Sequence, residues 1–361
     1  MLKPLILDRY IIRKFIGTYV LSLLLITVVV IIFDLSEKID DFVEKKAPIT
    51  AIIFAYYMNF IPYIVNLFSA LFVFITVILF TSQMASHSEI IAILSGGMSF
   101  FRMMFPYFIS SLCICAISIA LNLFIIPPAN ATRLAFEEQY VRTPFNNADR
   151  NLHYQLSPGV FIYIESFATW DNTARLFTME EFTGKQLRSK ISAESAKWDD
   201  AAKQWTLTHY SKRTIDGERE VVEHGEKMEL QINFDAEDLK RRTNFTESMN
   251  YYELNSYIDQ LKQRGDKGVK FALIEKNTRI AVPFSVFILT LIGVSLSSRK
   301  VRGGIGLKIG IGLALSFSYI LFLRFSEMFV HANLLPPVIA LWVPNCLYAV
   351  IAIILYRIAP K

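Results

Sequence analysis

The sequence has few of the residues that build metal centres or disulfide frameworks. Its three cysteines lie inside apolar runs, and its five histidines are scattered without the spacing of metal ligands. It also contains no GxxxxGK[ST] phosphate-binding loop, no HExxH zinc motif and no GxSxG nucleophile motif. We therefore predict no catalytic residue, no metal site and no cofactor, and we interpret the cysteines as packing residues. The residues concerned are Cys113, Cys115, Cys346, His87, His153, His209, His224 and His331.

Charged side chains are absent from six long stretches of the chain. A bilayer core of about 30 Å requires roughly 20 predominantly apolar residues in a helix, and stretches of this kind predict membrane spans. The chain is therefore expected to be an α-helical membrane protein with six transmembrane helices. The stretches are residues 15–33, 47–86, 103–132, 280–298, 309–323 and 335–356.

The second stretch, residues 47–86, is long enough for two crossings, and Pro62 offers a break. The distribution of positive charge decides between one crossing and two, because Lys and Arg concentrate in cytoplasmic loops. The two most basic short segments are the N-terminus and residues 299–308, and both are cytoplasmic only if an even number of spans separates them. One crossing gives four intervening spans. We therefore predict one crossing, with both termini in the cytoplasm.

The charged residues gather between the third and fourth spans. Residues 133–276 hold 45 of the 69 Asp, Glu, Lys and Arg residues, with a net charge of −3, so the overall charge of +5 belongs to the membrane portion. This distribution suggests no nucleic-acid partner. The same orientation places this water-facing stretch outside the cytoplasm. We expect three parts: residues 1–132 with spans one to three, 133–265 as an inserted domain, and 266–361 as a connector with spans four to six.

The inserted domain has the pattern of β structure. Segments 160–167, 175–182 and 204–211 are rich in β-branched and aromatic residues and are separated by turn residues. Several short strands at this spacing predict a sandwich or a jellyroll-like fold. From residue 250 to residue 276 the apolar residues recur near the helical period, which predicts a helical connector returning to the membrane.

A short helix is predicted at about residues 86–97, between spans two and three. Ser88 is a suitable N-cap, Glu89 is favoured in the first turn by the helix dipole, and Gly96 and Gly97 end the helix. Two interpretations stay open: a loop that packs on the bundle, and a coupling helix that fits a groove of an ATP-hydrolysing subunit. The apolar face consists of Ile90, Ile91, Ile93 and Leu94.

Several segments together resemble the LptF/LptG (YjgP/YjgQ) permease family across essentially the whole chain. They are 7-LDRYIIRKF-15, 88-SEIIAILSGGMSFFRMM-104, the stretch from Trp198 to Leu207, 276-KNTRIAVPFSVFILTLIGVSL-296 and Arg302-Gly303-Gly304. The order of three spans, a β domain and three spans is that of the family. The LDRY opening and the last span, 334-LLPPVIALWVPN-345, are more similar to the LptG branch than to the LptF branch.

The resemblance implies a permease subunit of an ABC-type exporter in the inner membrane of Gram-negative bacteria. Such an exporter extracts lipopolysaccharide from the membrane and passes it to a periplasmic bridge. The implied partners are LptB-like cytoplasmic ATPase subunits, a second, LptF-like permease, and single-span periplasmic LptC-like and LptA-like bridge proteins. The inserted β domain would then be periplasmic, and the short helix near residue 89 would meet the ATPase.

In the family, the first and fifth spans of the two permeases form gates, here near residues 15–36 and 305–330. Gly306 and Gly310 have the GxxxG spacing that permits close helix approach. The alternative is that these glycines only loosen the start of the helix.

Anionic lipid headgroups require cations at the outer ends of the spans. Possible contacts are Lys38, Lys45, Lys46, Arg133 and Arg324. Acidic residues crowd the same first loop, and Glu327 lies three residues after Arg324, so pairing within the chain is the alternative. A different function also stays open: a non-transporting membrane scaffold or sensor whose β domain binds a periplasmic partner.

Overall fold

The computed structural model divides into two compact units, which are considered separately. A helical unit consists of Met1–Phe136, Glu247–Tyr251 and Leu273–Lys361, and a β unit consists of Glu137–Thr246 and Tyr252–Ala272. The structure describes residues 6–141, 150–217, 219–240, 243–266, 268–298 and 304–359. The basic cluster at residues 299–302 and Gly303 of the family motif lie outside these ranges.

Among the described residues, six helical segments are long and apolar enough to cross a membrane, as predicted. They are α1 (Ile6–Glu44), Ile49–Ser86, Phe100–Tyr140, α9 (Val269–Ser297), Ile309–His331 within α10 (Gly304–His331), and α11 (Pro337–Ile358). Residues 49–86 form one such segment, as expected for the single crossing predicted there. The chain is a multi-pass helical membrane protein with a β domain inserted between the third and fourth spans.

The second and third segments each contain a π-helical stretch that precedes proline. The second consists of α2 (Ile49–Ala51), η1 (Ile52–Tyr57) and α3 (Met58–Ser86), and the third of α5 (Phe100–Ala120), η2 (Leu121–Ile125) and α6 (Ile126–Tyr140). Pro62 follows the first π stretch, and the Asn59 amide donates to the Phe54 and Ala55 carbonyl oxygens at 2.9 and 3.0 Å. Such bonds satisfy the backbone where the regular ladder is disturbed, so the proline does not split the span.

The core of the helical unit forms around α3 and α9. We compared the buried share of an apolar 18-residue stretch in each span. This share is 56% in the second segment and 61% in α9, but only 22% in α1 and 28% in α10. One stripe of α1 at helical spacing, Ile11, Phe15, Tyr19 and Leu23, packs into the core against α3 and α5. On its other side, Val20, Leu21 and Leu24 are exposed among the described residues.

Buried hydrogen bonds join the spans to one another. The Tyr19 hydroxyl and the Ser69 hydroxyl are 2.6 Å apart, and the Ser111 hydroxyl donates to Thr290 at 2.8 Å. Asn345 on α11 accepts from the Tyr319 hydroxyl of α10 at 2.9 Å and donates to the Ala281 carbonyl oxygen of α9 at 2.8 Å. In a membrane, such side-chain bonds and close packing hold helices together, because lipid provides no hydrophobic drive for association.

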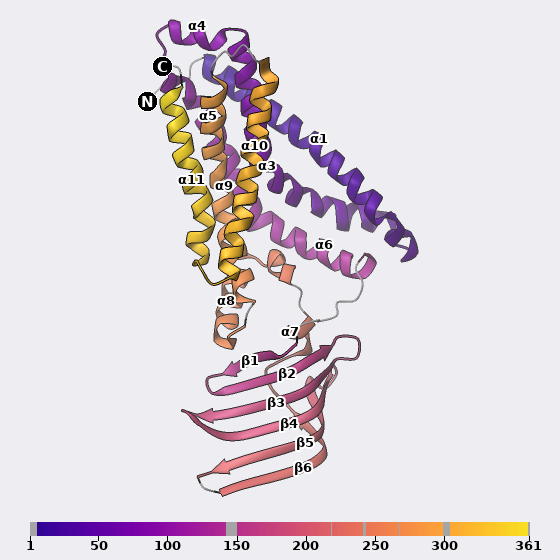
Figure 1. Cartoon of the computed structure of the whole chain (residues 1–361). Coiled ribbons are helices and arrows are strands. Elements are labelled where there is room, and N and C mark those ends of the chain that lie inside the picture. The colour runs from indigo at the N-terminus through magenta and orange to yellow at the C-terminus, as the bar shows by residue number, and fades with distance from the viewer. Residues whose placement is uncertain are drawn as a thin grey trace. The chain divides into compact units, whose positions relative to one another are not determined.

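The described strands of the β unit form one antiparallel sheet in sequential order (Figure 1). Its strands are β1 (Leu152–Ser157), β2 (Val160–Ala168), β3 (Thr173–Thr183), β4 (Gln186–Asp199), β5 (Gln204–Asp216) and β6 (Arg219–Leu230). The predicted strand segments fall within β2, β3 and β5. The sequence predicted a β domain with a sandwich or jellyroll-like fold. The β domain is present, and its described strands form one sheet in which successive strands connect as hairpins, without Greek-key connections between two sheets.

One face of this sheet carries the core of the β unit. Trp205 is fully buried, and its indole Nε1 donates to the Phe234 carbonyl oxygen at 2.7 Å. Phe167 and Phe177 pack beside the Trp205 ring. Leu239, on the short helix α7 (Ala236–Lys240), joins the same cluster, so the segment after β6 covers this face.

The predicted helical connector is interrupted. Helix α8 (Tyr251–Arg264) buries Leu254, Ile258 and Leu261, and it ends before Gly265, whose φ is +63°. Glycine adopts this left-handed conformation without a side-chain penalty. The chain then begins α9 at Val269, eleven residues before the uncharged stretch that predicted this span.

Candidate functional site

The predicted coupling helix is a seven-residue helix, α4 (Glu89–Ser95). Glu89 lies in its first turn, and the helix ends at Gly96, followed by Gly97 with φ of +82°, as the glycine pair predicted. Ser88 occupies the N-cap position, as predicted, but its φ is +64° and its side chain makes no capping hydrogen bond. A left-handed backbone points the hydroxyl away from the first-turn amides that an N-cap in the extended region reaches.

The two faces of α4 differ in burial. Ile90 is 1% exposed and, with Ile93 and Leu94, packs into the core formed by α1, α3 and α5. Ile91 is 51% exposed, and Ala92, Ser95 and both terminal glycines are also exposed. The helix is therefore anchored to the bundle on one side and presents an uncovered surface on the other, at the end of the unit where α11 finishes (Figure 1).

A buried ion pair joins the start of α1 to the residues that follow α4. The Arg102 guanidinium donates through both terminal nitrogens to the two carboxylate oxygens of Asp8, at 2.7 and 2.6 Å. Asp8 is 4% exposed. No sequence pattern indicated this pair, because the partners are 94 residues apart.

Lys38 lies against acidic and aromatic side chains at the far end of α1. Its ammonium group pairs with Asp34 one turn earlier and with the Tyr56 hydroxyl. It also lies 4.9 Å from the centre of the Tyr56 ring and 5.8 Å from that of Phe60. The sequence left two roles open for Lys38, contact with a lipid headgroup and pairing within the chain. The structure shows Lys38 paired within the chain.

Three of the predicted headgroup cations, Lys45, Lys46 and Arg324, are exposed. Lys45 and Lys46 are exposed in the turn that follows α1. Arg324 on α10 pairs with Glu327 at 2.9 Å, one turn away, and 65% of its side chain is exposed. Exposed pairs of this type contribute little to stability, so the Arg324 guanidinium can exchange its partner readily.

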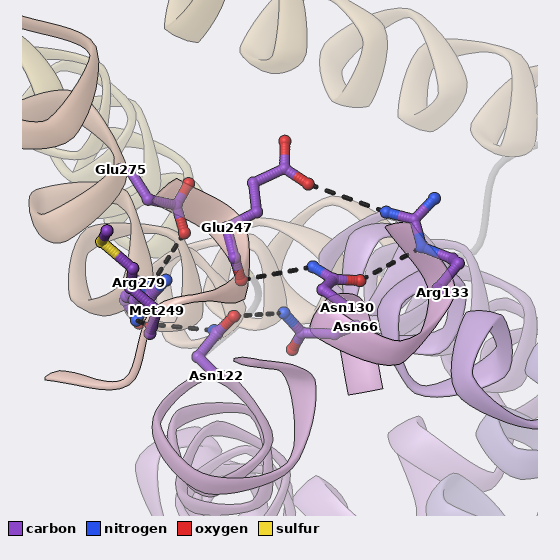
Figure 2. Close-up of polar contacts among 8 residues, drawn as sticks. All are labelled: Asn66, Asn122, Asn130, Arg133, Glu247, Met249, Glu275 and Arg279. Atoms are coloured by element: carbon purple, nitrogen blue, oxygen red, sulfur yellow. Dashed lines mark hydrogen bonds and ion pairs between the residues drawn. The ribbon is translucent and has the colours of Figure 1, made fainter. Parts of the chain in front are cut away.

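Arg133 is only 8% exposed and belongs to a polar network at the junction of α6 with the residues preceding Tyr251 (Figure 2). Its Nε donates to the Asn130 side chain at 3.3 Å, and its Nη2 lies 3.8 Å from a Glu247 carboxylate oxygen. The guanidinium also lies over the Tyr63 ring at 5.1 Å. These contacts hold Arg133 inside the unit.

Arg279 is a second buried arginine in this network, and the sequence reasoning did not single it out. Its Nε donates to Glu275 and its Nη1 to the Met249 carbonyl oxygen, both at 2.8 Å. Figure 2 shows Glu247 between the two arginines and Met249 beside Arg279. Asn122 links the network to α3, donating to the Arg279 carbonyl oxygen at 3.3 Å and accepting from Asn66 at 2.9 Å. Asn66 and Asn122 are polar residues inside apolar stretches, and this feature of the sequence could have indicated a buried polar network.

The glycines of α10 do not all pack in the same way. Side chains added at Gly306 or Gly310 would meet no described atom within 4 Å, whereas a Cβ at Gly312 would lie 2.1 Å from Ile78. On α9, a Cβ at Gly293 would lie 2.8 Å from Val77. The close approach to α3 thus occurs at Gly312 and Gly293. The Gly306–Gly310 face is open in the part of the chain that the structure describes.

The sequence matches the model of the family "Lipopolysaccharide export system permease LptF/LptG" over residues 9–358. The chain belongs to this family. A comparison with curated proteins gave no match. The family resemblance predicted from the short motifs is confirmed, and the matched range includes α4, the β unit, the first candidate span from residue 9 onward and the other five in full. The chain is thus a permease of lipopolysaccharide export and a multi-pass protein of the inner membrane.

Within an LptF/LptG permease, the described sites fall into two groups. The first group is at one end of the helical unit and contains α4 and the Asp8–Arg102 pair. The second is at the other ends of the same spans and contains Lys38, Arg133, Arg279 and Arg324. Among the predicted headgroup cations, Lys38 and Arg133 are held by neighbouring side chains, and Lys45, Lys46 and Arg324 are the exposed ones.

Proposed function

We propose that this chain is a permease subunit of an ABC-type exporter that extracts lipopolysaccharide from the inner membrane and passes it to a periplasmic bridge, driven by a separate ATPase. The observation that carries the proposal is the uneven burial of the spans. Helices α1 and α10 are the least covered of the six, at 22% and 28%. A lipid with several acyl chains requires a cavity whose walls are apolar helix faces not already packed within one subunit.

The proposed orientation follows from the distribution of Lys and Arg. Short segments assigned to the cytoplasm hold eleven such residues, against four in the outer short segments. The N-terminus, the C-terminus and α4 are then cytoplasmic, and the β unit is periplasmic. This orientation puts the exposed face of α4 on the side where ATP is available.

The path from α4 to α1 is direct. Ile90 of α4 belongs to the same buried cluster as Ile11 and Phe15 of α1. Arg102, seven residues after α4, donates two hydrogen bonds to Asp8 on α1. A cytoplasmic ATPase that binds Glu89, Ile91 and the residues ending at Gly97 would therefore act on a surface that is packed against α1. A displacement of α4 reaches α1 through packed atoms and a bidentate ion pair.

Different exposed surfaces of the chain are available to the expected partners. A second, LptF-like permease would face α1 and α10, including the open Gly306–Gly310 face. The periplasmic LptC-like and LptA-like bridge proteins would meet the β unit, where the edge strand β6 is largely exposed. We place the chain in the LptG branch on its LDRY opening and its proline-containing last span.

Purification of the complex tests this function. A tagged chain extracted in mild detergent is expected to co-elute with an ATPase, a second permease and bound lipopolysaccharide, and depletion of the chain should cause lipopolysaccharide to accumulate in the inner membrane. The scaffold or sensor alternative predicts a periplasmic partner without an ATPase and without accumulation. That result would replace the export proposal.

A further inference from the structure

A short segment, Glu247–Tyr251, belongs to the helical unit, although the residues on both sides of it belong to the β unit. It joins the helix η3 (Thr243–Ser248) to α8, and Met249 and Asn250 lie outside regular secondary structure. Backbone groups outside helices and strands take their partners from side chains or water. The side chains that bind the 247–251 segment therefore determine where it lies.

Side chains from two spans bind this segment (Figure 2). From α9, the Arg279 Nη1 donates to the Met249 carbonyl oxygen at 2.8 Å. From α6, the Asn130 side-chain amide donates to the Glu247 carbonyl oxygen at 3.5 Å. The spans that precede and follow the inserted domain in the chain thus both hold the same segment.

Arg279 makes the stronger of these two contacts. Its bond is charge-assisted and shorter than that of Asn130, and the residue is only 4% exposed. Its Nε also pairs with Glu275 at 2.8 Å, which is possible because a guanidinium carries several donors in one plane. A second contact of α9 supports the first, since the Lys276 ammonium lies 5.8 Å from the centre of the Tyr251 ring.

Arg279 is connected to the second and third spans as well. Its carbonyl oxygen accepts a hydrogen bond from the Asn122 side chain at 3.3 Å, and Asn122 accepts one from Asn66 at 2.9 Å. Hydrogen bonds therefore run without a break from α3 through η2 and α9 to the 247–251 segment. Contiguous contacts of this kind can carry energetic coupling between distant parts of a protein.

The charges of this network are matched within the chain. Arg279 pairs with Glu275, and the Arg133 guanidinium lies 3.8 Å from a Glu247 carboxylate oxygen. An anionic headgroup would have to displace a carboxylate from a buried arginine and leave that carboxylate without its partner, which is costly. The network therefore favours a mechanical role over lipid binding.

We infer that Arg279 is a positioning residue for the hand-over of the exported lipid. It fixes the 247–251 segment to the fourth span, so that a movement of the spans is passed to the chain that continues into the β unit. Arg279 acts through the Met249 backbone, and no side-chain replacement at position 249 removes that acceptor. This inference rests on the proposed export function.

The test compares Arg279→Gln with Glu275→Gln in the reconstituted complex of the full chain. Both variants break the ion pair, but only Arg279→Gln loses the charge-assisted bond to the Met249 carbonyl oxygen. Hydrogen exchange of the amides of residues 247–251 should rise roughly 10-fold in Arg279→Gln and less than about 3-fold in Glu275→Gln. Arg279→Lys should give an intermediate rate, because lysine offers only a point charge.

Lipid hand-over is the readout that a general loss of stability would not change alone. In Arg279→Gln, lipopolysaccharide delivered to the bridge protein per ATP hydrolysed should fall roughly 10-fold. The ATPase rate, and the capture of lipid by a photoreactive residue at position 25, should stay near those of the unmodified chain. A parallel loss of ATPase rate, capture and delivery would overturn the positioning role. Normal delivery, or an equal loss of delivery in Glu275→Gln, would overturn it as well.

The export proposal and this inference fail in different ways. If neither an ATPase nor lipopolysaccharide accompanies the purified chain, the export proposal is rejected, and the hand-over role is rejected with it. If the complex delivers lipid but hydrogen exchange of residues 247–251 is unchanged in Arg279→Gln, only the inference on Arg279 is overturned.

Discussion

Asp8 and Arg102 show how a single ion pair can connect two functional parts of a membrane protein. Both carboxylate oxygens and both terminal nitrogens of the pair are used, and little of either side chain is exposed. Bidentate geometry is specific to arginine, since lysine offers only a point charge. The pair fixes the start of α1 relative to α5, and through α5 relative to α4.

Replacing Arg102 by alanine should destabilise the protein strongly. Asp8 is only 4% exposed and would keep its charge without its partner, which costs more than breaking an exposed pair. Arg324→Ala, which breaks an exposed pair, should cost no more than about 1 kcal/mol. The thermal unfolding midpoint of the detergent-purified chain measures both. Similar midpoints for the two variants would contradict the structural role assigned to Arg102.

Trp205 has a comparable role in the β unit. Trp205→Phe removes the indole donor and leaves the Phe234 carbonyl oxygen buried without this partner, at a cost of about 1–3 kcal/mol. Trp170→Phe is the matched control, because 78% of Trp170 is exposed. Limited proteolysis of the full chain should cut the β unit of the first variant faster. Identical digestion rates would show that the bond contributes little.

At the scale of the element, Ile90 anchors α4 in the core, and Ile91 lies on the exposed face that we propose for the ATPase. Ile91→Asp should leave folding intact, because the side chain already meets solvent, yet it should uncouple ATP hydrolysis from lipopolysaccharide transport in the reconstituted complex. Ile90→Asp should instead prevent folding, since it puts a charge into the core. Normal transport by Ile91→Asp, or by Glu89→Ala, would contradict a coupling role for this helix.

The elements were predicted with different success for physical reasons. Hydropathy indicated six spans because membrane helices must be apolar across the hydrocarbon core, but it did not indicate where the helices end. Helix α9 begins among Lys270, Glu275 and Arg279, since helices continue past the apolar core. The strand pattern of the β unit located β2, β3 and β5 but not the sheet order, which depends on pairing between strands rather than on any one of them.

The site was less predictable than the fold. The end of α4 followed from Gly96 and Gly97, whose backbone preference is local. The conformation of Ser88 depends on how α4 packs, so the local capping rule failed there. The Asn66–Asn122–Arg279 network and the Asp8–Arg102 pair join residues far apart in the chain, and no single segment carries a signal for such partners.

At the scale of the whole molecule, the proposed function and the uneven burial of the spans together predict where the exported lipid enters. Photoreactive residues placed at Leu25 on α1 and Leu321 on α10, both more than half exposed, should capture lipopolysaccharide in the reconstituted complex. Leu347 on α11 is also exposed, at 47%, but lies on a span that the proposal does not assign to the gate. Capture there should be limited to ordinary phospholipid.

ATP should change these adducts, because a gate must open and close with each cycle, and an ATP-independent adduct would indicate passive contact with the bilayer. If position 347 captured as much lipopolysaccharide as positions 25 and 321, burial within one subunit would not predict the cavity wall. The exposed faces of α1 and α10 would then only be surfaces for lipid or a second subunit. The uneven burial would still require a partner, but it would no longer support a lateral entry between these two helices.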